Sequence, residues 1–180
     1  MTRKFSVIGL LVLGGLLASA ASADELHTCI YDSSDIALQA CTRAINSGEY
    51  KGVDLANAYI NRGAEWLRKE DYDRAIADST EALKLFPEST LAHNNRGLAW
   101  KHKGDLDRAL ADYSEAIRID PDNPGAYINR AAIREQQGDK RGAIDDLKKA
   151  LAAKPRKGKF VDVERYYQQA REALERLSNQ

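Results

Sequence analysis

The sequence predicts an all-α fold, a solenoid in which a pair of helices recurs along the chain. Three observations support this fold class. First, similar blocks of sequence begin 34 residues apart, at Asp71, Asp105 and Asp139. Second, a proline follows each block at the same interval, at Pro87, Pro121 and Pro155. Third, the composition favours helices over strands, since only 7% of the residues are aromatic and only four are prolines.

Each repeat is predicted to hold two helices separated by a short turn. The first helix is expected to end, in the three repeats, at Lys69, Lys103 and Gln137. Gly104 and Gly138 then supply the left-handed conformation that ends a helix without strain. Glu70 stands at this place in the first repeat, so we expect a slightly strained turn there. The aspartates that begin the blocks cap the second helix, and the prolines end it.

Both ends of such a stack need a segment that closes the apolar surface. In residues 158–180 a stripe with helical spacing predicts a capping helix: Phe160, Val163, Tyr167, Ala170, Leu174 and Leu177. At the other end, the segment from Asp35 is similar to the second helix of a repeat. Residues 24–34 are too short and polar for a full first helix, so we expect a half-repeat.

A 34-residue period with this internal pattern resembles the tetratricopeptide repeat. Small residues occupy the places where helices of that family cross closely: Gly63, Gly97, Ala131, Ala75, Ala109, Ala143, Ala82, Ala116 and Ala150. Trp66 and Trp100 take the aromatic place late in the first helix, where the third repeat departs with Arg134. Tyr113 and Leu147 take the large place in the second helix, where the first repeat departs with Ser79. The resemblance implies a right-handed superhelix of three helix pairs.

The repeats and the patterns at both ends of the chain divide it into units. A leader at residues 1–23 precedes a half-repeat at residues 24–55. Three repeats follow at residues 56–89, 90–123 and 124–157, and a capping helix takes residues 158–180.

The first residues are typical of a secretory signal. Arg3 and Lys4 precede an uncharged apolar run, and Ala21-Ser22-Ala23 has the small residues that signal peptidase needs. We expect cleavage after Ala23. A membrane anchor is the alternative, but the apolar run is shorter than the roughly 20 residues of a spanning helix. The pattern predicts an exported protein, periplasmic or secreted, that has no membrane contact after cleavage.

Cys29 and Cys41 fit an exported protein, because a near pair of cysteines in an oxidising compartment is usually a disulfide. A redox-active pair normally has the C-x-x-C spacing, which this pair lacks. A metal site would need two more ligands, and His27 is the only one nearby. We therefore predict a structural disulfide that ties down the half-repeat.

An arginine and an aspartate recur sixteen residues apart in every repeat. The pairs are Arg62 with Asp78, Arg96 with Asp112, and Arg130 with Asp146. Arginine stands where the family usually has a large apolar residue. We predict a structural ion pair between the two helices of each repeat. A ligand-binding row of arginines and a set of solvated charges are the alternatives.

The family resemblance implies a concave groove lined by the first helix of each repeat. The corresponding residues are Asn57, Ile60, Asn61, Arg68, Leu91, Asn94, Asn95, Leu98, Lys101, His102, Ile128, Asn129 and Glu135. Asn61, Asn95 and Asn129 form a row at identical places. Since an amide both donates and accepts hydrogen bonds, this row could hold the backbone of an extended peptide. Asparagine chosen for solubility and helix contacts is the alternative.

The sequence contains no motif for catalysis, a metal or a cofactor. It lacks H-E-x-x-H, G-x-S-x-G and a phosphate-binding glycine loop. A formal net charge of zero argues against a general nucleic-acid binder. The basic clamp by which some family members hold a chaperone C-terminus is also expected to be absent, because Ile60, Gly125 and Ile128 stand near its places.

These patterns predict an exported module that binds a protein or peptide in its concave groove and is not an enzyme. Self-association is possible. The alternative is a structural component of a cell-envelope complex, acting through its convex face or its capping helix. A redox protein built on the two cysteines is the least favoured reading.

Overall fold

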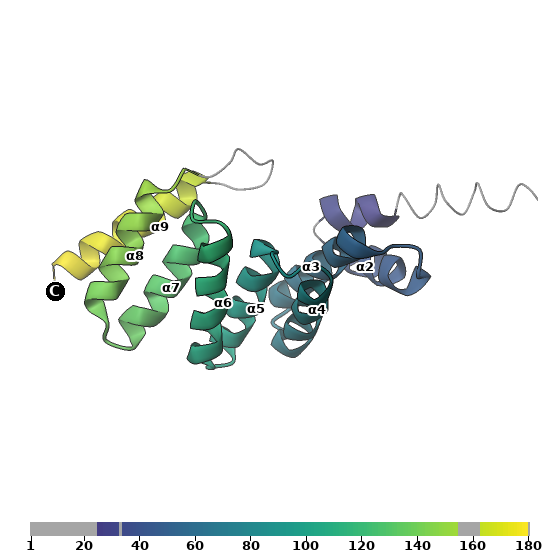
Figure 1. Ribbon diagram of the computed structural model, residues 1–180, viewed down its shortest axis with the longest axis horizontal. Helices are drawn as coiled ribbons and strands as arrows, with labels where there is room; N and C mark the ends of the chain where they lie inside the picture. Colours follow the sequence, from purple (N-terminus) through teal and green to yellow (C-terminus); the bar gives the residue numbers. More distant parts are fainter. Residues whose placement is uncertain (1–24, 33, 155–162, 180) are drawn as a thin grey trace, which may run out of the picture.

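The computed structural model describes residues 25–32, 34–154 and 163–179. All regular secondary structure in these ranges is helical, and the helices stack in chain order (Figure 1). None of these helices has the length and apolar character that crossing a membrane requires. The predicted signal at residues 1–23, Pro155 and Phe160 lie outside the described residues.

Residues 25–31 are helical, and longer helices follow. They are α2 (Asp35–Ser47), α3 (Gly52–Arg68), α4 (Tyr72–Leu85), α5 (Thr90–His102), α6 (Leu106–Ile119), α7 (Pro124–Gln136), α8 (Lys140–Ala152) and α9 (Val163–Ser178). Each helix packs on its neighbours in the chain, and α3, α5, α7 and α9 also touch in succession. The predicted all-α solenoid of helix pairs is therefore confirmed.

The turns inside the helix pairs follow the local sequence. Gly104 and Gly138 have φ values of 82° and 81°, and Glu70 has φ 59°, the strained left-handed conformation expected there. The aspartate that follows each of these residues caps the next helix: its side chain accepts the backbone N–H of Arg74, Arg108 or Gly142. Local sequence thus fixes where α4, α6 and α8 begin.

Small residues let the helices of each pair approach closely. Ala75, Ala109 and Ala143 are fully buried at the same place in α4, α6 and α8. Gly97 lies against the ring of Tyr113, which is also fully buried. The core consequently consists of close contacts between neighbouring helices through small side chains, as expected for a stack of repeats.

Helix α9 closes the C-terminal end by lying on α8 and α7 (Figure 1). Its buried residues Ala170 and Leu177 join a cluster with Tyr127 and Leu147. The Tyr167 hydroxyl donates to the Ala153 carbonyl at 2.6 Å. The helix therefore continues the stack, and its other side is exposed at Arg165, Gln168 and Glu172.

The disulfide joins Cys29 to Cys41 at the N-terminal end. Both residues are buried with Ala40, Ala44 and Ala58, so the cluster spans residues 25–31, α2 and α3. The short helix at residues 25–31 stands where a full repeat would place its first helix. The bridge holds this short segment against the stack.

Candidate binding site

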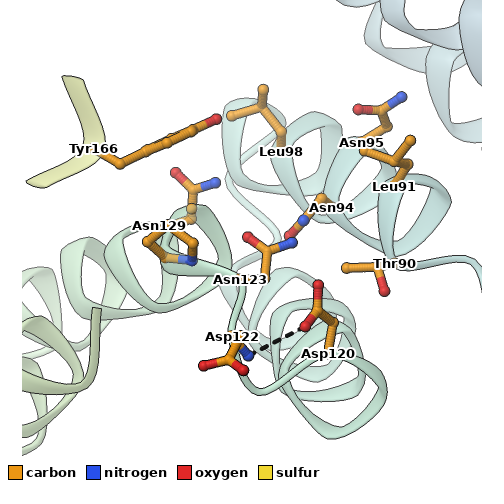
Figure 2. A pocket seen from close by; sticks show the side chains of 12 residues that line it. Thr90, Leu91, Asn94, Asn95, Leu98, Asp120, Asp122, Asn123, Asn129 and Tyr166 are labelled. Atoms are coloured by element: carbon orange, nitrogen blue, oxygen red, sulfur yellow. Dashed lines mark hydrogen bonds between the residues drawn. The ribbon is translucent and has the colours of Figure 1, made fainter. Parts of the chain in front are cut away.

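An opening of about 340 Å³ lies between α5, the α6–α7 turn, α7 and the start of α9 (Figure 2). Its lining consists of Thr90, Leu91, Asn94, Asn95, Leu98, Asp120, Asp122, Asn123, Pro124, Gly125, Asn129 and Tyr166. The volume is at the lower end of the range for small-molecule and side-chain pockets, about 300–1,000 Å³. We call this the α5–α7 opening.

The opening exists because the second and third repeats pack less closely than the first and second. Helices α5 and α7 touch less extensively than α3 and α5. Asn95 donates from Nδ2 to the Ile60 carbonyl at 3.3 Å and so ties α5 to α3. In the described chain, Asn129 donates no corresponding bond from α7 to α5. The first interface is therefore closed, and the second is open.

Glycine at the start of α7 brings α9 to the edge of the opening. Gly125 occupies the place that Leu91 has in the preceding repeat. A Cβ atom at Gly125 would lie 3.2 Å from Cε1 and Cζ of Tyr166, closer than side chains normally pack. The missing side chain thus allows the Tyr166 ring to lie over the first turn of α7 and form one wall.

The α6–α7 turn supplies polar groups to the opposite wall. Asn123 caps α7 by accepting the Ala126 N–H at 3.2 Å. Asp120 accepts the Asp122 N–H at 3.2 Å, and Asp122 accepts the Lys154 N–H at 2.9 Å. Each aspartate uses only Oδ1 in these bonds. Neither carboxylate is paired with a cationic side chain within the described residues, so the lining is acidic.

Asn94 brings an unmatched amide to the same space. Its Oδ1 atom is buried and has no hydrogen-bond partner within the described residues. Figure 2 shows Asn94 of α5, Asn123 at the start of α7 and Asn129 of α7 near one another. A buried carbonyl oxygen without a donor costs about 1–3 kcal/mol. The wall of the opening therefore contains a buried acceptor without a donor.

Only part of the predicted groove meets at this opening. Leu91, Asn94, Asn95, Leu98 and Asn129 line it. The first-repeat residues do not: Ile60 is buried with Ala82 and Ala92, and Asn61 donates to the Asn57 carbonyl at 2.8 Å. Ile60 was predicted to line the groove, and its side chain is buried in the contact that α3 makes with α4 and α5.

The rest of the predicted groove is engaged elsewhere or lies outside the opening. Arg68 pairs with Glu65, and the His102 ring stacks on Tyr72 with centroids 4.8 Å apart. Glu135 pairs with Arg176 of α9. Ile128 packs against the C-terminal apolar cluster. Lys101 is half-buried and is not part of the lining.

The recurrent arginines and aspartates form two-pronged ion pairs between the helices of each repeat. In the pairs Arg62–Asp78, Arg96–Asp112 and Arg130–Asp146, Nε and Nη2 each donate at 2.7–2.9 Å. All three aspartates are buried. The hydrogen bonds that Arg62 donates to Asp78 hold the pKa of Arg62 above its ordinary value despite burial. These side chains face one another, so they hold the helix pairs together.

The second and third aspartates have an additional partner. His93 Nδ1 lies 3.0 Å from Asp112 Oδ1, and its Nε2 lies 3.2 Å from the Pro87 carbonyl. Arg134 Nη1 donates to Asp146 Oδ2 at 2.8 Å. Arg134 stands where the other repeats have tryptophan, so this departure from the family pattern adds a second cation to the buried Asp146.

Sequence reasoning missed the acidic turn and the tyrosine of the opening. Asp120, Asp122 and Asn123 were assigned only to the boundary between repeats. The segment P-D-N-P-G could have drawn attention, because Pro124 and Gly125 stand where the previous boundary has Thr90 and Leu91. Tyr166 carries no comparable signal, since its position depends on how α9 packs.

Tetratricopeptide repeat models match the chain over residues 65–124 and over residues 103–178. Together the matches span more than half of the sequence. No curated protein sequence gives a match.

Solved structures with a similar fold include several tetratricopeptide proteins. A thermophilic example from Thermus thermophilus has a TM-score of 0.65 and 18% identity, covering 87% of this chain and 80% of that chain. The first such domain of Spaghetti (RPAP3), bound to the HSP90 peptide SRMEEVD, has a TM-score of 0.61 and 20% identity, covering 73% and 97%. The TPR2B domain of yeast Sti1, in a complex with pHsp70, has a TM-score of 0.55 and 25% identity, covering 66% and 97%.

Proposed function

This chain belongs to the tetratricopeptide repeat family, and from that premise we propose that it binds a segment of a protein partner at the α5–α7 opening. Domains of this family are generally protein-interaction modules without catalysis. Two of the similar structures are complexes, one with an HSP90 peptide and one with pHsp70. The partner of this chain is accordingly a peptide or protein, and no catalytic role is proposed.

The observation that carries this proposal is the opening itself. It combines an exposed apolar side chain, Leu91, which is 62% exposed, with the unmatched Oδ1 of Asn94. Apolar contact supplies affinity, and amides oriented by rigid helices can bond a peptide backbone with little ordering cost. Packed helices α5 and α7 form the walls, so the site needs no folding step to accept a ligand.

We further propose that the protein acts after export. The apolar run and Ala21-Ser22-Ala23 near the N-terminus support this, and so does the Cys29–Cys41 disulfide, which persists only under oxidising conditions in most cells. The periplasm is the proposed compartment. Fractionation of cells that express the full chain, with the N-terminal residue of the product sequenced, tests this; an uncleaved product in the cytoplasm would contradict it.

The experiment for binding is affinity capture with the chain from Asp24 onward as bait. The groove variant carries Leu91→Ala and Asn129→Ala, two lining residues without structural hydrogen bonds. The matched control carries Ala77→Arg and Ala111→Arg, which lie exposed at equivalent places on α4 and α6. Circular dichroism establishes that both variants fold.

A partner that the groove variant loses and the control retains is the expected result. If the control loses the partner and the groove variant keeps it, the outer helices carry the interaction and the proposal fails. That outcome would favour a structural component of an envelope complex.

A further inference from the structure

We infer that the α5–α7 opening takes a basic side chain, above all arginine, from the bound segment. This inference rests on the proposed function and names the chemistry of the same site. The argument depends on the charge of the lining, its excess of hydrogen-bond acceptors and its apolar walls.

Among the described residues, the lining is acidic and contains no cationic side chain. Asp120 and Asp122 each keep Oδ2 free of any hydrogen bond within the described residues, while Oδ1 accepts a backbone N–H. Arg118, on the preceding helix α6, is engaged by Glu115 and lies 3.8 Å from Glu88. The negative charge of the two aspartates is therefore not neutralised from α6.

Acceptors at the opening lack donors. The buried Asn94 Oδ1 has no partner within the described residues, and the two aspartates add oxygens that can only accept. Asn123 already uses its Oδ1 to cap α7. A guanidinium group carries five N–H donors and no acceptor, so it complements this set better than any neutral side chain. A carboxylate ligand would find like charges instead.

Apolar walls suit the stem of a basic side chain. Leu91 and Leu98 of α5 and the Tyr166 ring of α9 stand across from the acidic turn (Figure 2). Arginine and lysine bury their methylene groups on such surfaces while the charged end stays at polar groups. The face of Tyr166 can in addition attract a cation. A basic side chain thus matches both walls at once.

A site that prefers basic side chains should bind an acidic peptide poorly. The peptide SRMEEVD, to which the Spaghetti domain is bound, is acidic. The two aspartates repel such a peptide, and the lining, as far as the structure describes it, holds no basic side chain to receive its carboxylates. Charge alone should therefore separate basic from acidic segments at this site.

The test uses capped peptides of sequence Ala-Ala-X-Ala-Ala, in which X is arginine, citrulline or glutamate. Citrulline has nearly the shape of arginine and no charge. Two-dimensional ¹H–¹⁵N NMR of the chain from Asp24 onward, including side-chain amides, follows each titration. We expect the arginine peptide to shift the signals of Asn94, Asn95 and Asn129. Its affinity should exceed that of the citrulline peptide by about threefold to tenfold, the range for charge-assisted contacts at a partly exposed site.

The variant Asp120→Asn with Asp122→Asn removes the charge but keeps the oxygens that accept the backbone N–H groups. It should abolish the preference for arginine over citrulline. The control Asp145→Asn, at an exposed place on α8, should leave the preference unchanged. Unaltered signals from α3 and α4 establish that the variants fold.

Equal binding of the arginine and citrulline peptides by the wild-type chain would overturn the inference. So would a preference that survives in the Asp120→Asn, Asp122→Asn variant, or stronger binding of the glutamate peptide. The proposed function has a separate test, because capture of a partner depends on Leu91 and Asn129. A partner lost by that groove variant but held equally by the two-aspartate variant would retain the function and reject the basic side chain.

Discussion

At the scale of single residues, Gly63 and Gly97 occupy the same place in consecutive repeats but face different neighbours. A Cβ atom at Gly97 would lie 2.9 Å from Cε1 of the buried Tyr113 ring. The nearest atom to a Cβ at Gly63 is Ser79 Oγ, at 3.4 Å. Tyr113 and Ser79 are themselves equivalent residues, so the same glycine position is tightly packed in the second repeat and less tightly packed in the first.

This difference in packing predicts different effects for two matched substitutions. Gly97→Ala should lower the free energy of unfolding by about 1–3 kcal/mol, because the Tyr113 ring must shift. Gly63→Ala should leave it unchanged or raise it by up to about 1 kcal/mol, since alanine favours helix over glycine. Urea unfolding of both variants measures the difference. Equal effects would show that the close contact at Gly97 is not a constraint.

Asp112 makes a second residue-scale prediction, which concerns pH. Burial raises the pKa of Asp112, but hydrogen bonds from His93 and Arg96 outweigh it and leave the pKa below its ordinary value of 3.8. A lowered pKa in the folded state means that ionised Asp112 stabilises the fold above pH 3.8, and that this stabilisation is lost as the pH falls through the folded-state value.

The variant Asp112→Asn should therefore cost about 1.5–3 kcal/mol of unfolding free energy at pH 7, the value of a hydrogen bond to a charged group. The cost should shrink as the pH falls below 3.8. Urea unfolding of wild type and variant from pH 3 to pH 7 gives the difference directly, with Asp145→Asn as an exposed control. A cost independent of pH would reject the role of the charge.

The sequence allowed the interactions that recur in every repeat to be predicted, but not those that occur in one repeat only. The spacing of Arg96 and Asp112 repeats in all three units, so it could be read as a pair without coordinates. His93 at Asp112 and Arg134 at Asp146 each occur in one repeat only. Nothing in a period of 34 distinguishes such a partner from an ordinary surface residue.

At the scale of elements, caps and breakers determine where helices begin and end, and these are local. Asp71 and Gly138 could be assigned from the sequence because a helix terminus depends on a few neighbouring residues. The short helix at residues 25–31 was harder to predict from the sequence, since its position depends on the disulfide and on packing against α2 and α3. The α5–α7 opening could not be predicted from the sequence, because it depends on distances between helices.

The disulfide predicts a local response to reduction. The Cys29–Cys41 bridge joins residues 25–31 to α2, and a bridge over so short a loop is worth on the order of 3 kcal/mol. The double variant Cys29→Ala, Cys41→Ala should lose hydrogen-exchange protection in residues 25–50 and keep it from α4 onward. Protection that remains uniform along the chain would mean that the short helix is held by its apolar contacts alone.

At the scale of the whole molecule, each helix depends mainly on its neighbours in the stack. Such an array has stability that is close to a sum of units and interfaces, so damage at one end spreads only a limited distance. The interface between the second and third repeats is the more open one. It should therefore be the boundary at which a disturbance from the C-terminal end stops.

Leu177→Ala tests this expectation. Leu177 is buried against the cluster of α7, α8 and α9, and its truncation should cost about 2–5 kcal/mol in that cluster. Hydrogen exchange should increase in α7, α8 and α9, while α3 and α4 keep their protection. The exposed neighbour Glu175→Ala is the matched control and should change neither region. An equal loss of protection from α3 to α9 would mean that the chain unfolds as one cooperative unit, in which the α5–α7 opening is no boundary.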